Sequence, residues 1–217
     1  MQQDQNIKGF TILELLVVIT IVAIISAVAY PNFSNWQQDR ELRAAMEKAA
    51  TMLSSVNTLS QRGNYPFVQF RVTPNGTTST KFISKGMDAT SLSIKLNNAQ
   101  TIECNTSSGS YWDNNQVDET TKKISTHISK DGAVCFSKDG SYFKANGTLK
   151  NNLNVTVENR STNQYLILCT TTNASNGGKC PLDQGGGLEK PAYLVEWTRF
   201  GNISKFKWSG SDWNRQN

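Results

Sequence analysis

The sequence contains one histidine, His127, and no motif that would give it a catalytic or metal-binding role. Its four cysteines are not spaced as C-x-x-C, so the spacing indicates neither a zinc site nor a dithiol redox site. No P-loop, G-x-G-x-x-G fingerprint or H-E-x-x-H pattern is present. We therefore predict that the protein is not an enzyme and has no catalytic residues, metal or cofactor.

The chain also lacks long runs of one charge, although it is basic overall. Lys and Arg number 22 against 17 acidic residues, a formal net charge of +5, yet no run of five or more basic residues occurs. A basic balance without clustering is typical of a solvated surface. Charge alone therefore does not predict a nucleic-acid partner.

The cysteines all follow an apolar N-terminal segment, and their even number fits an oxidising compartment such as the periplasm. Three pairings are open. We favour Cys169 with Cys180, which would close a polar loop, and Cys104 with Cys135, which would tie an Asn-rich loop to a central hairpin. Two structural disulfides are expected.

The apolar segment covers residues 10–30 and contains a single charged residue, Glu14. As a helix it is about 31 Å long, enough to cross the hydrocarbon core of a bilayer. A secretory signal peptide would use a small-residue site at Ser26, Ala27 and Ala29, but its apolar region is usually shorter and has no acid near its start. A plain membrane anchor leaves Glu14 unexplained, because a carboxylate at the centre of a spanning helix costs roughly 2.5 to 3.5 kcal/mol.

The residues K-G-F-T-I-L-E, from Lys8 to Glu14, resemble the class III signal of type IV pilins and type II secretion pseudopilins. The resemblance implies that a membrane prepilin peptidase removes residues 1–9 by cutting between Gly9 and Phe10, and that Phe10 is then N-methylated. Pro31 would be residue 22 of the mature chain, where pilins commonly carry a proline.

Cleavage would leave Phe10 with a free cationic amine and Glu14 one helical turn away, and both charges would need partners in an apolar setting. A neighbouring subunit staggered along a filament can place its Phe10 amine against Glu14, so that the acid is satisfied only after assembly and sets the register. The alternative is an acid that reaches the headgroups or pairs with its own N-terminus. We favour the pair between subunits.

Beyond this segment, Pro31 predicts a kink in the preceding turn, because it lacks an N–H and crowds the carbonyl four residues earlier. Residues 31–62 then read as an amphipathic helix that ends near Arg62 and Gly63. We therefore expect one helix of about fifty residues, apolar all round in residues 10–30 and apolar on one face in residues 31–62. The apolar positions on the single apolar face of residues 31–62 are Leu42, Ala45, Ala49, Met52, Leu53, Val56 and Leu59.

From Tyr65 onward the pattern favours β-structure. F-V-Q-F-R-V alternates at period two, one hairpin turns at residues 138–140, another turn lies at residues 146–147, and a closing hairpin turns at Gly201 and Asn202. We predict an α+β pilin fold, in which the long N-terminal helix packs on an antiparallel β-sheet head, residues 63–217, with disulfide-clipped loops. The head resembles minor pilins and pseudopilins of the GspH/FimT kind.

Some FimT-like pilins bind DNA through a G-R-x-R motif near the C-terminal turn, and the matching residues 201–204 here lack both arginines. The remaining candidates for DNA contact are Arg199, Lys205, Lys207 and Arg215, which are interleaved with aromatic residues. The alternative is a closing hairpin whose aromatic side chains enter the core and whose lysines face water. We favour this alternative.

These patterns lead to a minor type IV pilin that initiates or caps a filament through its N-terminal helix. The resemblance implies a prepilin peptidase, an inner-membrane assembly platform and other pilins as partners. The subunit would lie in the bacterial inner membrane with its head in the periplasm, and later in an extracellular pilus or a periplasmic pseudopilus. A major pilin or a type II secretion pseudopilin stays open, as does a filament-displayed DNA receptor.

Overall fold

A computed structural model describes most of the helical N-terminal part of the chain and the strands that follow. The chain divides into two compact units, Met1–Gln38 and Asp39–Asn217. The described residues are 11–63, 65–74, 79–98, 117–126, 132–137, 142–144, 165–171, 180–181, 185–198 and 201–216.

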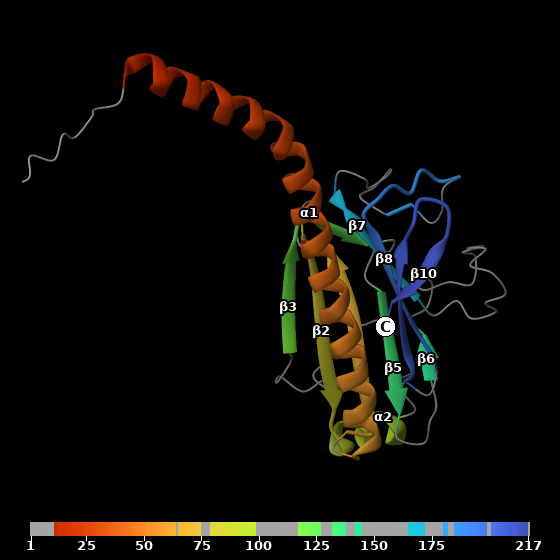
Figure 1. Cartoon of the computed structure of the whole chain (residues 1–217). Coiled ribbons are helices and arrows are strands. Elements are labelled where there is room, and N and C mark those ends of the chain that lie inside the picture. The colour runs from red at the N-terminus through yellow and green to blue at the C-terminus, as the bar shows by residue number, and fades with distance from the viewer. Residues whose placement is uncertain are drawn as a thin grey trace, which may run out of the picture. The chain divides into compact units, whose positions relative to one another are not determined.

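Helix α1, Ile12–Gln61, is 50 residues long (Figure 1). Within the second unit its apolar face is buried, and the buried positions include six of those expected from the helical periodicity, with Leu59 partly buried beside them. Gly63, at φ 77°, follows the last turn and donates its N–H to the carbonyl of Ser60 at 3.2 Å. The one-sided apolar pattern is thus confirmed, whereas the kink at Pro31 stays a prediction.

The first sheet has five antiparallel strands in the order β3-β2-β1-β5-β6. The hairpin expected around residues 138–140 is confirmed as the β5–β6 pair, in which Cys135 faces Phe143 in register. The turn expected at residues 146–147 lies outside the described residues. The strands are β1 (Phe67–Pro74), β2 (Ser79–Met87), β3 (Val117–Lys122), β5 (Gly132–Ser137) and β6 (Tyr142–Lys144).

The second sheet is also antiparallel, in the order β10-β9-β8-β7-β4. The β8–β9 pair is the closing hairpin expected from the sequence. Together with α1, the two sheets confirm the α+β class. The strands are β4 (Ile124–Thr126), β7 (Tyr165–Thr170), β8 (Ala192–Trp197), β9 (Ile203–Trp208) and β10 (Trp213–Gln216).

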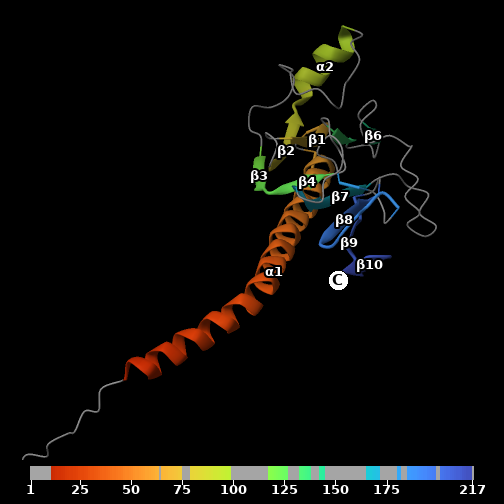
Figure 2. The same cartoon turned by 90° about the horizontal axis from the view of Figure 1, so that it is seen from above.

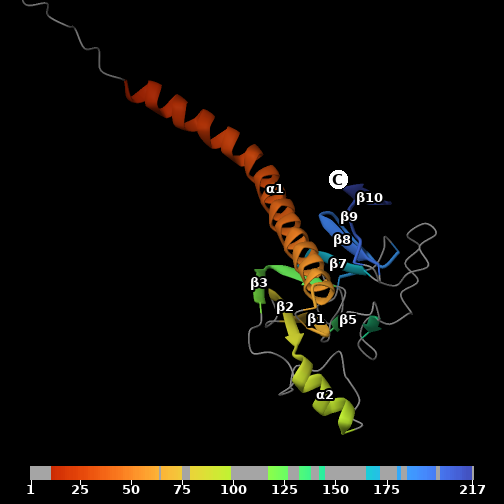
Figure 3. The same ribbon diagram turned by 90° about the horizontal axis from the view of Figure 1, so that it is seen from below.

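A short helix, α2 (Ala89–Asn97), was not expected from the sequence. Asp88 caps it by accepting hydrogen bonds from the backbone N–H and the hydroxyl of Ser91, both at 2.7 Å. These bonds, the backbone one foremost, hold the pKa of Asp88 below its ordinary value. Figures 2 and 3 show α2 at the end of β2, extending away from both sheets.

The main core lies where α1 meets both sheets. Side chains from β1, β2 and β5 of the first sheet and from β7 and β8 of the second pack with the buried face of α1. A second cluster covers the other face of the second sheet and includes Phe206 and Trp208. Strand β7 is therefore buried along its whole length, which explains its continuous apolar sequence Y-L-I-L-C-T.

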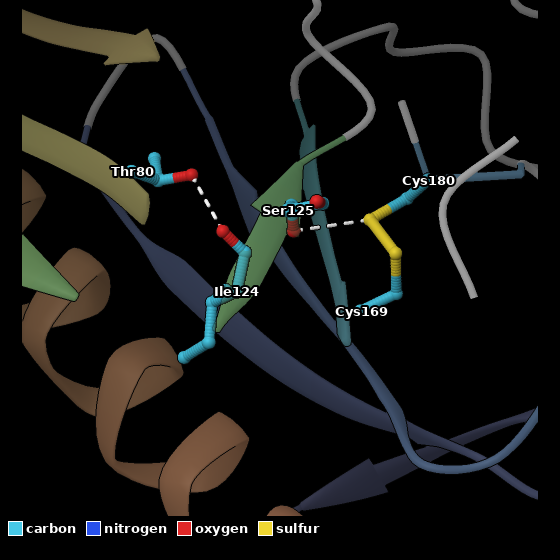
Figure 4. Close-up of a disulfide and its surroundings, with 5 residues drawn as sticks. All are labelled: Thr80, Ile124, Ser125, Cys169 and Cys180. Carbon is cyan, nitrogen blue, oxygen red and sulfur yellow. Dashed lines mark hydrogen bonds between the residues drawn. A yellow bond between two sulfur atoms is a disulfide. The ribbon is translucent and has the colours of Figure 1, made fainter. Parts of the chain in front are cut away.

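The chain passes from the first sheet to the second at Lys123, a non-glycine residue at φ 58° between β3 and β4. Thr80 on β2 donates its hydroxyl to the carbonyl of Ile124 at 2.9 Å, which joins the two sheets (Figure 4). The Cys169–Cys180 disulfide lies beside this crossing, and the backbone N–H of Cys180 binds the carbonyl of Thr126 at 2.9 Å.

The disulfide confirms the predicted pairing of Cys169 with Cys180. The Cys180 sulfur also lies 3.0 Å from the carbonyl oxygen of Ser125 (Figure 4), a packing contact, because a disulfide sulfur has no hydrogen to donate. Cys135 is disulfide-bonded as well. Cys104, its predicted partner, lies outside the described residues.

The turn between β8 and β9 packs directly on α1. Gly201, at φ 82°, donates its N–H to the carbonyl of Thr198 at 2.9 Å and leaves no room for a Cβ beside the side chain of Asn57. Gly187 has a similar backbone, φ 87°, but open space where its Cβ would lie. The two glycines therefore share a backbone constraint and differ in packing.

We expect Gly201→Ala to lower the free energy of unfolding by about 2 kcal/mol or more, because it adds a collision with Asn57 to the roughly 1 to 2 kcal/mol cost of a left-handed alanine. Gly187→Ala, the matched control, should lose only the backbone contribution. Urea unfolding of both variants measures the difference. Equal losses would contradict the close approach of the turn to α1.

Candidate functional site

The N-terminus of α1 is capped by Thr11. The backbone N–H of Glu14 donates to Thr11 Oγ1 and that of Leu15 to the Thr11 carbonyl, both at 3.2 Å. Thr11 and Glu14 thus have the T-x-x-E spacing of a capping box, a local signal that the sequence interpretation overlooked. Gly9 and Phe10 lie outside the described residues, so the cleavage and methylation sites stay predictions.

The turns that follow expose apolar side chains on every side of the helix. The exposed fraction of the large apolar residues runs from 87% at Ile12 to a minimum of 46% at Val17, and Ile25 is still exposed. Thr20, the hydroxyl residue in this stretch, donates to the carbonyl of Leu16 at 2.8 Å and so satisfies its own hydroxyl hydrogen. A helix that is apolar all round normally requires a surrounding apolar phase or other helices.

In the described part of the chain, no helix is both long and apolar enough to cross a membrane. The crossing of a membrane by residues 10–30 stays a prediction from the sequence.

In the second unit, β9 turns two lysines toward α1, because Phe206 and Trp208 occupy the alternate positions and enter the core. The Nζ atom of Lys205 lies 3.0 Å from both carboxylate oxygens of Glu47. The Nζ atom of Lys207 lies 2.9 Å from both carboxylate oxygens of Asp39. Two strand lysines are thus paired with two helix acids.

Asp39 also accepts a hydrogen bond from the hydroxyl of Tyr193 at 2.9 Å, and Lys207 Nζ lies 5.6 Å from the centre of the Tyr193 ring. We call these three residues the Asp39 cluster. Burial, and next the hydrogen bond to Asp39, raise the pKa of Tyr193. Burial alone would lower the pKa of Lys207, but the hydrogen bond to Asp39 and the nearby charges outweigh it and raise that pKa.

The candidates for DNA contact lie in different environments, two in ion pairs with α1 and one exposed to solvent. Lys205 and Lys207, which we expected to face water, are held by acidic residues of α1, so part of their charge is already neutralised. Arg215 is exposed on β10, and Arg199 lies outside the described residues. Nucleic-acid contact at these four positions stays a prediction that the two ion pairs do not favour.

A shallow groove of about 700 Å³ runs beside the Lys205–Glu47 pair, between α1 and the β8–β9 turn. Its α1 wall carries hydroxyl groups at Thr51, Ser54, Ser55 and Thr58. Among the described residues, no group of three or more His, Cys, Asp or Glu side chains is placed to hold a metal.

Residues 4–30 match the family model of the prokaryotic N-terminal methylation motif. The matched residues include Glu14 and most of the exposed apolar stretch of α1. No solved structure matches the chain.

The Asp39 cluster predicts a loss of stability at alkaline pH. Tyr193 and Lys207 both have raised pKa values, so the stability that they contribute is fully present below their ordinary values of 10.0 and 10.5 and is lost as the pH rises through the higher folded values. We expect the parent to lose more unfolding free energy between about pH 9 and about pH 11 than Tyr193→Phe/Lys207→Met does.

Urea unfolding at the two pH values measures these losses. Arg215→Met, which removes an exposed cation from the neighbouring strand, is the control and should keep the parent's pH dependence. At neutral pH, Asp39→Asn should cost only about 1 kcal/mol, because the cluster is partly exposed and solvent screens it. Identical alkaline losses in the parent and the double variant would rule out a contribution from the cluster.

Proposed function

Residues 4–30 carry the class III prepilin signal of type IV pilins and pseudopilins, and on that premise we propose that the chain is a minor type IV pilin that initiates or caps a filament through α1. The signal implies a membrane-anchored precursor, processing by a prepilin peptidase and assembly with other pilins. Subunits of this kind are structural proteins rather than enzymes. The observation that carries the proposal is this signal at the start of a long helix whose first turns expose apolar side chains on all sides.

Assembly in this proposal uses the N-terminal turns of α1. Cleavage after Gly9 frees the Phe10 amine, and Glu14 then lies one turn from a cation at the end of an apolar rod. Docking among the helices of other pilins covers the exposed apolar residues and pairs Glu14 with a neighbour's Phe10 amine. Before assembly, residues 10–30 lie in the inner membrane, and residues 63–217 form a periplasmic head.

Two features of the head support this proposal. The Cys169–Cys180 disulfide fits an oxidising compartment. The closing β8–β9 hairpin, stacked on α1, supports the resemblance to GspH/FimT-like minor subunits. A major pilin or a type II secretion pseudopilin is the rival within the same class. The abundance of this chain in purified filaments distinguishes a major pilin from a minor one, because a minor subunit is scarce.

We expect Gly9→Ala to block processing, because the added methyl group lies at the bond that the peptidase cuts. The full chain should then accumulate in the membrane fraction when it is co-expressed with a prepilin peptidase. Mass spectrometry of the intact chain reports whether residues 1–9 are present. Gln5→Ala, a change within the leader but away from the cut, should be processed normally. Normal cleavage of Gly9→Ala would place the processing site elsewhere.

Substitutions at Glu14 test the negative charge of its side chain while the cap at the start of α1 stays in place. Glutamine keeps a polar side chain of similar shape but loses the charge, whereas leucine loses both, and both variants keep the backbone N–H that Thr11 Oγ1 binds. If Glu14 pairs with a neighbour's amine, Glu14→Gln and Glu14→Leu should both be processed but enter filaments at least about tenfold less than the parent, a change of about 1.4 kcal/mol. Quantitative blotting of sheared filaments and of the membrane fraction measures incorporation.

Thr11→Val is the matched control, because it removes the cap and leaves the acid in place. It should assemble better than either Glu14 variant. If Glu14→Gln instead entered filaments as well as the parent did, assembly would not need the negative charge, and the charge pair would be excluded.

A further inference from the structure

Three aromatic side chains lie exposed on the first unit, after the apolar turns of α1. Tyr30 is 76% exposed, Phe33 60% and Trp36 52%. They are spaced three residues apart, which places neighbouring members on the same side of a helix. The rings of Phe33 and Trp36 are in contact, with centroids 5.6 Å apart. We call these residues the aromatic patch.

The position of the patch along the chain is distinctive. Residues 15–38 contain no charged side chain, and the first charges after them are Asp39, Arg40 and Glu41. At 1.5 Å per residue, a helix that starts at Ile12 reaches the thickness of a hydrocarbon core, about 30 Å, near residue 32. The aromatic patch therefore occupies the turns between the end of the apolar stretch and the first ionised groups.

We propose that the aromatic patch lies in the phospholipid headgroup layer of the membrane before assembly and fixes the depth of α1 in the bilayer. The proposal rests on the membrane stage of the proposed function and adds a lipid-contact surface to it. Tyr and Trp rings favour the membrane–water interface, because they combine an apolar body with a polar group. The structure places such rings where the helix changes from apolar to charged surroundings.

The neighbours of the patch favour lipid headgroups over a second protein chain as its partner. Asn35 and Gln37 are exposed between and beside the rings. The wet headgroup layer can hydrogen-bond the Asn35 amide, whereas the packed core of a subunit interface would have to desolvate it at a cost of about 1 to 3 kcal/mol.

Depth-dependent quenching of Trp36 fluorescence tests this placement. The full chain is reconstituted at low protein-to-lipid ratio into vesicles of phosphatidylcholine and phosphatidylglycerol, brominated either near the headgroups or near the ends of the acyl chains. The other four tryptophans all lie beyond residue 63, so the quenching that Trp36→Phe removes belongs to Trp36. We expect headgroup-side bromine to quench Trp36 at least about twofold more than deep bromine.

Removing the other two rings tests whether the patch sets the depth. Tyr30→Ala/Phe33→Ala should bring the ratio of shallow to deep quenching down toward about one, because the helix loses its interfacial anchors. Ser34→Ala is the matched control, a truncation in the same turns that leaves all three rings and the exposed amides, and should keep the parent's ratio. Flotation of the vesicles verifies that each variant is in the lipid fraction.

Three results would overturn the proposal. Trp36 quenched more by deep bromine, or not at all, in floated vesicles would exclude the headgroup layer and leave the pilin assignment standing. Quenching that changes only at high protein density, together with cross-links between copies at Trp36, would identify another subunit as the partner. If the full chain failed to float with the lipid, both the headgroup placement of the aromatic patch and the membrane stage of the proposed function would be wrong. Processing at Gly9 is tested by a separate experiment.

Discussion

One long helix must satisfy two different environments, and the rest of the structure depends on how α1 does so. Residues 42–59 show a single apolar face, which both sheets of the head bury. Residues 12–25 expose apolar side chains all round. Exposed apolar surface of this extent normally marks an interaction site. The head completes its core with its own side chains, whereas the proposed function gives the exposed N-terminal turns of α1 the helices of other subunits as their partners.

The head holds α1 through packing on one side of the helix and ion pairs beside it. Core side chains from both sheets meet the apolar face, and this contact is non-directional. Lys205 and Lys207 add direction, because each lysine meets one specific acid of α1. The close approach of Gly201 to Asn57 adds a steric limit near the end of the helix. Apolar burial thus supplies most of the stabilisation, and these polar and steric contacts restrict how the helix can lie.

Local periodicity explains what the sequence could predict. The helix, its buried positions, the β5–β6 and β8–β9 hairpins and the α+β class all follow from patterns within a few turns or strands. The Lys205–Glu47 pair joins residues 158 positions apart, and no local pattern connects them. The crossing between sheets at Lys123 was missed for a related reason, since a lysine at positive φ carries no turn signature. The burial of Phe206 and Trp208 could be predicted from their alternation with the lysines, whereas the acids of α1 that pair with Lys205 and Lys207 could not.

Glu14 combines a local role, carried by its backbone N–H, with a proposed role in assembly, carried by its side chain. In the described chain its backbone N–H is bound by Thr11, in a capping arrangement worth about 0.5 to 2 kcal/mol. In the proposed mature subunit, a free amine and the positive end of the helix would lie nearby, and in water such interactions contribute only about 0.3 to 1 kcal/mol. Breaking a pair buried away from water costs far more, about 3 to 5 kcal/mol. Pairing between subunits can therefore dominate only where neighbouring helices or lipid exclude water, which ties the function of the acid to the exposed apolar turns around it.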